Sequence, residues 1–374
     1  RARALRYTPG RMADGYLDLY RALIGARRAE APRPRGAAEG EIVNLALFCH
    51  SVLSDWNHGN AHFLRGVVSE LCARGHVVRV FEPVGAWSHE NLLREQGEAP
   101  LRRVRAVYPA LDVHLYDPAT FDPAPVLDGV DLILVHEWNE PAVIARLGAF
   151  RRANRRARLL FHDTHHRAIT GTGPGAIGSL DLSGYDGVLA YGRVLRDLYL
   201  ANRWTRRAWV WHEAADPSVF RPLPVHEEER EGDLVWVGNW GDEERSAELR
   251  EFLVEPVAAL GLRATAHGVR YPEMAQRELS AAGIRYAGWL ANFDVPAAFA
   301  RHALTVHVPR RPYACALPGI PTIRPFEAMA CGVPVIDLQS AVRRLAAAAP
   351  VHGGRGAYIL TGRGVEQSSQ GTAL

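Results

Sequence analysis

The sequence predicts an α/β protein built from two parallel-sheet domains. Between residues 42 and 336, short apolar runs typical of buried strands alternate with stretches whose apolar residues recur at helical spacing. Such alternation predicts parallel sheets covered by helices on both faces. The alternation breaks once, over residues 216–233, where the chain is rich in proline and then in acidic residues. A break of this composition predicts a linker between two domains.

The first half of the chain predicts one complete sheet. Residues 1–40 are rich in Arg, Ala, Gly and Pro and predict a flexible leader. Residues 41–220 form the predicted N-terminal domain, in which residues 59–73 carry the clearest helical pattern. The predicted strands of this domain cover residues 42–48, 76–81, 111–115, 132–135, 158–162 and 187–190.

The second half repeats the alternation. Residues 221–232 are the predicted linker, residues 233–340 the C-terminal domain, and residues 341–374 an irregular tail that is rich in Ala and Gly. The predicted strands cover residues 234–237, 262–266, 284–287, 304–308 and 333–336. The predicted helices cover residues 243–259, 272–281, 293–301, 325–331 and, in the tail, 339–349.

Composition excludes several classes of function. The chain contains no lysine, so a Walker-type phosphate loop and a pyridoxal Schiff base are both excluded. Arginine binds phosphates bidentately, so a diphosphate ligand remains possible. The net charge of +3 is too small to indicate a nucleic-acid partner.

Cellular location is predicted from cysteines and apolar runs. The four cysteines are scattered, which indicates neither a zinc site nor a disulfide framework and favours a reducing cytoplasm. No apolar run reaches the ~18 residues that a membrane span requires, so we expect no integral membrane segment.

Residues 321–336, PTIRPFEAMACGVPVI, are the most informative segment. They predict a short helix, with Pro325 in its first turn, followed by a buried strand. The free N–H groups of that turn and the helix dipole predict an anion site. Glu327 lies beside it and is expected to face a cleft. A carboxylate next to a phosphate-ready helix start suits a nucleotide, whose ribose hydroxyls would bind the acid.

This segment resembles the donor-binding signature of GT-B glycosyltransferases, in particular the CgeB-like group and its family 1/4-like relatives. The R-x-F-E-x-x-A-C-G run matches in order and spacing, from Arg324 to Gly332. The resemblance implies two Rossmann-like domains facing a cleft. It also implies that the diphosphate is held by N–H groups near Phe326, with Arg324, while Glu327 binds the ribose.

Two departures from the family accompany this resemblance. Many retaining members carry a second acid eight residues before the position of Glu327, where this chain has Gly319. The stereochemistry of transfer is therefore unassigned. The family also ends in further αβ structure and a helix returning to the first domain, which the residues after 336 do not predict. We therefore expect a truncated C-terminal end.

The resemblance and the strand ends together predict a donor site in the C-terminal domain. Glycines after a strand let the backbone approach a ligand closely. Arg245 is the candidate for a second diphosphate ligand, although a surface pair with Glu248 explains it almost as well. Trp289 is placed where this fold flanks the nucleotide base, and it can also be simple core. The full predicted set is Gly238, Asn239, Trp240, Arg245, His267, Trp289, Arg324, Phe326 and Glu327.

A run of titratable residues follows the strand that ends at residue 162. Asp163, His165 and His166 suit general base work, because His titrates near neutrality and Asp can orient it. The run HDTHHRA also resembles an equivalent segment in CgeB-like sequences. A metal site is the rival interpretation, but alternation along an extended segment leaves each face only two good ligands. A satisfied polar turn is the third possibility.

We therefore predict a metal-independent glycosyltransferase without a cofactor. It would move a sugar from a nucleotide diphosphate sugar to a hydroxyl of an unknown acceptor: a glycan, a protein or a small molecule. A nucleotide-sugar epimerase of the same fold is one alternative. A non-catalytic binding or coat protein built on a degenerate glycosyltransferase is the other, and the missing second acid favours it.

Overall fold

The computed structural model of the chain describes residues 42–173, 176–320, 322–338, 358–361 and 364–367. The predicted leader and the predicted helix over residues 339–349 lie outside the described residues. Within the described part, no helix is both long enough and apolar enough to cross a bilayer.

The chain divides into two compact units. The N-terminal unit contains the described residues up to Ser54 and then Phe63–Glu213. The C-terminal unit contains Asp55–His62 and the described residues from Ala214 onward. The predicted N-terminal domain, residues 41–220, therefore differs in two ways: it ends seven residues too late, and it includes the eight-residue segment 55–62 that groups with the C-terminal unit.

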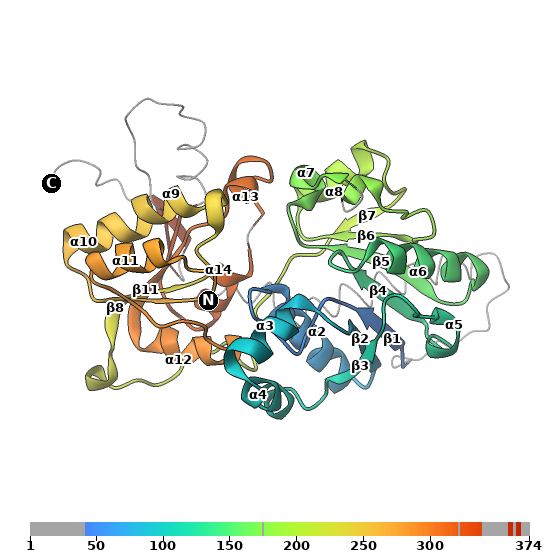
Figure 1. The fold of residues 1–374 in the computed structure, drawn as a ribbon, viewed down its shortest axis with the longest axis horizontal. Helices are drawn as coiled ribbons and strands as arrows, with labels where there is room; N and C mark the ends of the chain where they lie inside the picture. Colours follow the sequence, from blue (N-terminus) through green and yellow to red (C-terminus); the bar gives the residue numbers. More distant parts are fainter. Residues whose placement is uncertain (1–41, 174–175, 321, 339–357, 362–363, 368–374) are drawn as a thin grey trace. The chain divides into compact units, whose positions relative to one another are not determined.

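The N-terminal unit is built on a seven-stranded parallel sheet of order β3-β2-β1-β4-β5-β6-β7 (Figure 1). Its strands are β1 (Asn44–Phe48), β2 (Val77–Pro83), β3 (Asp112–Tyr116), β4 (Leu132–His136), β5 (Arg158–Asp163), β6 (Gly187–Ala190) and β7 (Ala208–Val210). The first six confirm the predicted strands, because buried parallel strands are apolar runs. The three residues of β7 are too few to show a pattern and were not predicted.

Helices connect these strands. They are α2 (Asn60–Ala73), α3 (Trp87–Gln96), α4 (Ala99–Val107), α5 (Pro123–Val126), α6 (Pro141–Ala153), α7 (Arg167–Thr170), the 3-10 turn η3 (Ile177–Ser179) and α8 (Arg193–Ala201). Helix α2 matches the predicted helix over residues 59–73.

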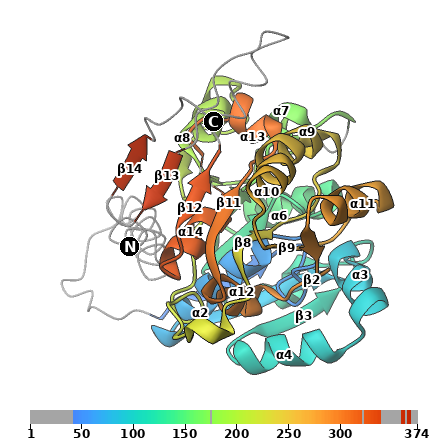
Figure 2. The same cartoon turned by 90° about the vertical axis from the view of Figure 1, so that its left-hand side faces the viewer.

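The C-terminal unit has a second seven-stranded sheet, of order β10-β9-β8-β11-β12-β13-β14. Its strands are β8 (Gly232–Val237), β9 (Ala264–His267), β10 (Ile284–Tyr286), β11 (His302–His307), β12 (Val335–Asp337), β13 (Tyr358–Thr361) and β14 (Gly364–Gln367). The first five strands in chain order are parallel. Strands β13 and β14 join antiparallel at one edge, beyond β12 (Figure 2). The prediction of an irregular tail is therefore wrong for these two strands. They form by pairing with a neighbouring strand, which their local sequence does not indicate.

The helices of the C-terminal unit cover both faces of its sheet. Along β8, Leu234 and Trp236 pack in one apolar cluster with α9, α10 and α11, while Val235 and Val237 pack in a second with α12 and α14. Alternate side chains of a strand point to opposite faces, which explains this division. The helical elements are η4 (Glu227–Glu229), η5 (Asp242–Glu244), α9 (Ser246–Leu249), η6 (Arg250–Val254), α10 (Glu255–Leu260), α11 (Glu273–Ala281), η7 (Asn292–Asp294), α12 (Val295–Ala300), α13 (Arg311–Cys315) and α14 (Ile323–Ala330).

The predicted continuous helix over residues 243–259 is interrupted in the structure. The π-helical segment η6 separates α9 from α10, whose second residue is Pro256. Proline has no N–H to give to the carbonyl of the preceding turn, so the regular hydrogen-bond pattern cannot continue through this position.

Each sheet reverses its strand order at one place, between β1 and β4 in the first and between β8 and β11 in the second. In open α/β sheets, ligands bind beyond the carboxyl ends of the strands at such a switch point. The fold therefore directs attention to the loops after β8 and β11.

Candidate functional site: a cationic cavity in the C-terminal unit

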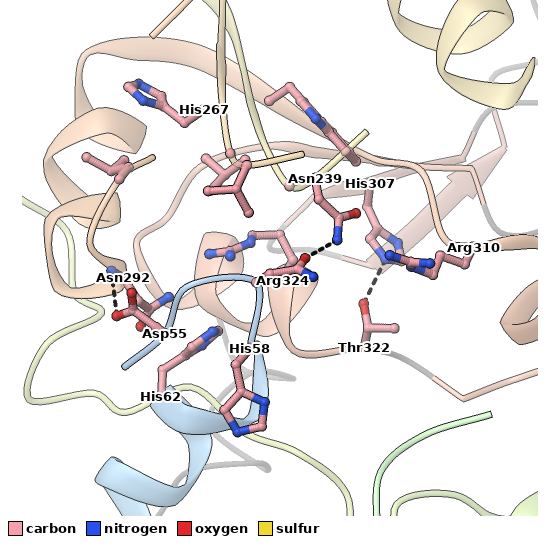
Figure 3. A pocket seen from close by; sticks show the side chains of 18 of the residues that line it. Asp55, His58, His62, Asn239, His267, Asn292, His307, Arg310, Thr322 and Arg324 are labelled. Carbon is pink, nitrogen blue, oxygen red and sulfur yellow. Dashed lines mark hydrogen bonds between the residues drawn. The ribbon is translucent and has the colours of Figure 1, made fainter. Parts of the chain in front are cut away.

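A cavity of about 240 Å³ lies beyond the carboxyl ends of β8 and β11 (Figure 3). All of its lining residues belong to the C-terminal unit, which includes the segment Asp55–His62. Its titratable lining residues are predominantly cationic or imidazole-bearing, and Asp55 is the one carboxylate among them. The charged and imidazole side chains are Asp55, His58, His62, Arg245, His267, His307, Arg310 and Arg324.

Two glycines allow the strand ends on one wall to approach closely. A side chain at Gly268, whose φ is +153°, would place its Cβ 2.0 Å from the carbonyl oxygen of Gly238. A Cβ at Gly238 would lie 2.7 Å from the ring of Trp236. Gly238 was predicted from its strand-end position, and the structure gives the physical reason: two backbones meet there.

Arg245 lies at the cavity without a carboxylate partner among the described residues. Its guanidinium donates to the carbonyl oxygens of Val308, at 3.1 Å, and Asn239, at 2.6 Å. It also lies over the ring of Trp236, 5.1 Å from the centroid. Burial, and then the charge of Arg310, lower the pKa of Arg245 to about 9. A bound anion would favour the charged form of Arg245 and offset the repulsion from Arg310.

The surface pair of Arg245 with Glu248 is not formed. Glu248 is buried and accepts a hydrogen bond from Arg311 at 2.8 Å. Arg310, which lines the cavity, bonds to Glu244 at 2.6 Å. Of the two arginines after β11, Arg310 therefore lines the cavity, whereas Arg311 bonds to Glu248 and does not.

Glu327 does not line the cavity, contrary to the expectation of an acid facing a cleft. Its side chain is fully buried. Its Oε1 accepts hydrogen bonds from His62 Nδ1, at 2.6 Å, and Asn292 Nδ2, at 3.1 Å, while Oε2 pairs with Arg324. Burial by itself raises the pKa of Glu327, but Arg324, His62 and Asn292 together bring it below its usual value. A buried carboxylate persists only with such partners.

The partners of Glu327 are themselves cavity residues. His62, Asn292 and Arg324 all line the space, and Figure 3 shows His62 and Arg324 reaching toward it from separate elements. Glu327 therefore acts on the cavity through side chains that it holds in place.

The segment Asp55–His62 was not predicted as part of this site. Asp55 Oδ2 accepts from the backbone N–H of Asn292 at 3.2 Å, and Asn57 pairs with Asn239. The odd sequence after the first strand, with its glycine and histidines, was the available signal. The sequence of this segment alone does not indicate that it contacts residues 239 and 292.

Predicted base-flanking residues line the cavity as well. His267 and Trp289 are both half-buried lining residues. Burial and nearby Arg285 lower the pKa of His267 to about 4, so its imidazole is neutral near pH 7. Trp289 Nε1 has no hydrogen-bond partner among the described residues.

The rings of two predicted site residues are packed in the core. The prediction for Phe326 concerns the N–H groups near it and stays a prediction. Trp240 is only 3% exposed and packs with α9 and α10, and Phe326 is 4% exposed and packs in the cluster of α12. Neither ring lines the cavity. An aromatic residue beside a glycine turn or a helix start has the same local sequence signature whether it is core or ligand contact, so the structure decides.

The predicted catalytic residues belong to the N-terminal unit and form a buried polar cluster there. Asp163 is fully buried and accepts from Tyr199 Oη at 2.7 Å and from the N–H of His165 at 2.9 Å. Burial and then the charge of Glu137 raise the pKa of Asp163 to about 7. His166 Nδ1 lies 2.7 Å from Thr170 Oγ1.

The backbone that carries His165 and His166 is not extended as the prediction assumed. Strand β5 ends at Asp163, and His166 already precedes helix α7, so the expected alternation stops after residue 163. His165 is half-buried, with its ring 5.0 Å from that of Trp138. Within the part of the chain that the structure describes, no group of three or more His, Cys, Asp or Glu side chains is placed to hold a metal ion.

Glu137 is a buried acid of this cluster that was not predicted. Its Oε2 lies 2.7 Å from His136 Nε2, and Thr164 donates to Oε1 at 3.2 Å. Burial raises the pKa of Glu137 to about 8 and lowers that of His136 to about 3. The pair is therefore largely uncharged at neutral pH.

Comparison with known proteins supports the fold and the class of protein. Residues 245–343, about a quarter of the chain, match the profile of the family described as "Glycosyl transferase-like". This segment contains Arg245, Arg310, Arg324 and Glu327. A search of curated proteins finds no match.

Solved structures with the same fold are glycosyltransferases. An alpha-glucosyltransferase in complex with UDP and a 13-mer DNA containing a HMU base has a TM-score of 0.50 and 10% identity, covering 79% of this chain and 80% of that one. A glycosyltransferase from Rickettsia africae ESF-5 has a TM-score of 0.51 and 12% identity, covering 79% of both chains. The chain has the GT-B fold, and residues 245–343 are similar to a glycosyltransferase-like family. The CgeB-like subgroup stays a prediction.

Proposed function

We propose that the protein is a glycosyltransferase whose cavity binds the diphosphate of a nucleotide sugar. The observation that carries the proposal is Arg245, an arginine without a carboxylate partner among the described residues, at the switch point of the second sheet. Two further arginines, Arg310 and Arg324, line the same cavity. A diphosphate is an anion of the size and charge that such a cluster binds.

The chemistry follows from the same charges. In sugar transfer, the bond between the sugar and the diphosphate breaks, and negative charge grows on the departing phosphate. Preorganised arginines stabilise that charge in the transition state more than in the bound donor, which is the condition for catalysis. The proposal assigns this stabilisation to Arg245, Arg310 and Arg324 and requires no divalent ion.

Glu327 contributes indirectly in this proposal. By holding Arg324 and His62 it fixes the geometry of two cavity residues, so the ribose contact expected from sequence is replaced by a positioning role. In the N-terminal unit, the half-buried His165 is the most accessible of the predicted catalytic residues, and we assign it and its neighbours Asp163 and His166 to the acceptor. The sugar, base and acceptor are left open.

A binding screen tests the donor proposal. Thermal melting with UDP, GDP, ADP and dTDP should show a rise in melting temperature for at least one, because a ligand that binds only the folded state stabilises it. The matching nucleotide sugars are then incubated with and without candidate acceptors, in the presence of EDTA. Acceptor-dependent release of the nucleoside diphosphate supports the transferase.

Other outcomes assign the alternatives. Conversion of the nucleotide sugar without any acceptor would identify an epimerase. Binding without turnover would favour the degenerate binding protein, and the absence of any nucleotide-dependent melting shift would overturn the donor site itself. Loss of turnover in EDTA would overturn metal independence.

A further inference from the structure

Three side chains at the edge of the cavity form a hydrogen-bonded chain. His307 and Asp337 are register partners at the carboxyl ends of β11 and β12. His307 Nδ1 lies 2.8 Å from Asp337 Oδ1, and His307 Nε2 lies 2.8 Å from Thr322 Oγ1. His307 is buried, and both His307 and Thr322 line the cavity. Figure 3 shows the contact between His307 and Thr322.

Thr322 occupies the N-cap position of α14, but its hydroxyl does not cap the helix. A threonine at this position usually accepts a hydrogen bond from an N–H of the first turn. Here no such side-chain bond is made. The hydroxyl bonds to His307 instead, beside Arg324 in the cavity lining.

The direction of the hydrogen bonds depends on the charge of His307. Because Asp337 accepts the Nδ1 proton, Nε2 of a neutral His307 can only accept, so Thr322 must donate its hydroxyl proton to His307. If His307 is protonated, Nε2–H donates to Thr322 Oγ1. The hydroxyl proton of Thr322 is then free to turn into the cavity.

We propose that His307, held by Asp337, is a proton-linked positioning residue that turns the Thr322 hydroxyl toward the phosphate of a bound ligand. On binding, His307 takes one proton from solvent at Nε2, and Nε2–H donates to Thr322 Oγ1. The Thr322 O–H then donates to a phosphate oxygen. No covalent bond of the ligand changes in this step. The inference rests on the proposed function only in taking the ligand to be a diphosphate.

The charges around His307 explain why ligand and proton are coupled. Asp337, on the neighbouring strand, is bonded to His307 Nδ1. Of the cavity arginines, Arg310 bonds to Glu244 and Arg324 to Glu327, whereas Arg245 has no bonded carboxylate among the described residues. A bound diphosphate offsets the charge of Arg245, which couples binding of the anion to uptake of the proton in this proposal. As charge grows on a departing diphosphate, the bond from Thr322 strengthens with it.

Calorimetry measures the coupled proton directly. UDP and, separately, inorganic pyrophosphate are titrated into the full chain at constant pH in buffers of different ionisation enthalpy. We expect the wild type to take up more protons per bound ligand than His307→Gln or Thr322→Val. Protons from the ligand itself contribute equally to all three proteins, so the difference reports the protein. Thr322→Ser should restore the uptake.

Affinity gives a second readout. Loss of one hydrogen bond to a charged ligand predicts an affinity about three- to tenfold weaker for Thr322→Val, with little loss for Thr322→Ser. His307→Gln should make affinity less dependent on pH. If His307→Gln does not fold, the Val and Ser variants of Thr322 carry the test.

His302 offers a matched control at the opposite end of the same strand. It is also buried and also contacts a threonine, Thr265 Oγ1 at 3.3 Å, but it does not line the cavity. His302→Gln should leave proton uptake unchanged. Equal uptake in the wild type, His307→Gln and Thr322→Val, with binding intact, would overturn the inference alone. Binding of pyrophosphate with proton uptake but no binding of UDP would overturn the nucleotide proposal alone, and no binding of either would overturn both.

Discussion

Nδ1 of His62 lies 2.6 Å from Oε1 of Glu327, although 265 positions separate the two residues in the sequence. Both side chains are almost completely withdrawn from solvent. The carboxylate therefore joins the segment Asp55–His62 to helix α14 inside the C-terminal unit. Glu327 also pairs with Arg324. One buried acid therefore positions two cavity residues, His62 and Arg324, that are far apart in the sequence.

Replacement of Glu327 should weaken both the fold and the cavity. Glu327→Gln keeps the size of the side chain but leaves Arg324 without its counter-charge. Removal of one partner from a buried pair costs about 3–5 kcal/mol, so we expect a lower melting temperature. Affinity for the nucleoside diphosphate found in the screen should fall at least about tenfold, or about 1.4 kcal/mol.

A surface pair provides the control for Glu327. Glu278→Gln breaks the more exposed pair with Arg250, which lies away from the cavity. It should change stability by less than about 1 kcal/mol and leave affinity unaltered. A Glu327→Gln protein with wild-type melting temperature and wild-type affinity would contradict the assigned positioning role.

The contrast between fold and site shows what local sequence can predict. Strands such as Leu132–His136 were visible because both faces of a parallel sheet are buried, which makes the strand a continuous apolar run. Arg245 was a candidate because of the family resemblance and its place after a strand end, and the structure places it at the cavity. The bond between His62 and Glu327 was not, because a carboxylate expected at the surface and one buried against a distant histidine look alike in one dimension.

Other errors have equally physical causes. Strand β13 is defined by antiparallel pairing with β12, and β14 by antiparallel pairing with β13. Such pairing leaves little local trace in the sequence. Asp163 was predicted as a catalytic residue from its neighbours in sequence, and the bond that Tyr199 donates to one of its oxygens from 36 positions away could not be predicted from them. Tertiary partners, rather than local propensity, decide these cases.

Arg245→Gln should separate function from stability. In the ligand-free protein the guanidinium is desolvated beside Arg310 with no carboxylate bonded to it, so its removal should leave the melting temperature unchanged or slightly raised. Loss of a charged contact to a diphosphate should weaken nucleotide affinity by about 1.5–3 kcal/mol. Calorimetric titration and thermal melting of the same preparations measure the two effects.

Arg250→Gln is the matched control for Arg245. It belongs to the same helical region but bonds to Glu278 outside the cavity. We expect a small loss of stability and unchanged affinity. If Arg245→Gln destabilises the protein and binds nucleotide normally, Arg245 is a structural residue.

The buried acid Glu137 should make the stability of the protein depend on pH. Its pKa is about 8 in the folded protein, against 4.5 when exposed. Between these values the unfolded carboxyl has lost its proton and the folded one keeps it, so unfolding releases a proton and stability falls as pH rises. This decline can reach about 1.4 kcal/mol per pH unit.

Glu137→Gln removes that decline because the amide does not titrate. Melting temperatures measured from pH 6.5 to 8 should fall more steeply for the wild type than for Glu137→Gln. His136, with a pKa of about 3, is neutral throughout this range and does not obscure the comparison. Glu140→Gln, at an exposed position nearby, should follow the wild type. A constant difference between Glu137→Gln and the wild type across this range would contradict the burial of an uncharged acid.

Gly268→Ala should close the wall of the cavity by steric conflict. The added Cβ would lie 2.0 Å from the carbonyl oxygen of Gly238, a distance that forces the loops after β8 and β9 apart. Asn239, in the loop after β8, and His267, the last residue of β9, line the cavity there. We expect both a lower melting temperature and loss of nucleotide binding, measured by thermal melting with and without the ligand.

Gly283→Ala isolates the contribution of backbone strain. Gly283 also has a positive φ, +78°, but a Cβ there would meet nothing within 4 Å. Its alanine variant should lose about 1–2 kcal/mol of stability from the left-handed conformation alone and keep its affinity. If Gly268→Ala loses no more stability than Gly283→Ala and binds nucleotide as tightly, the close approach of the two backbones does not shape the site.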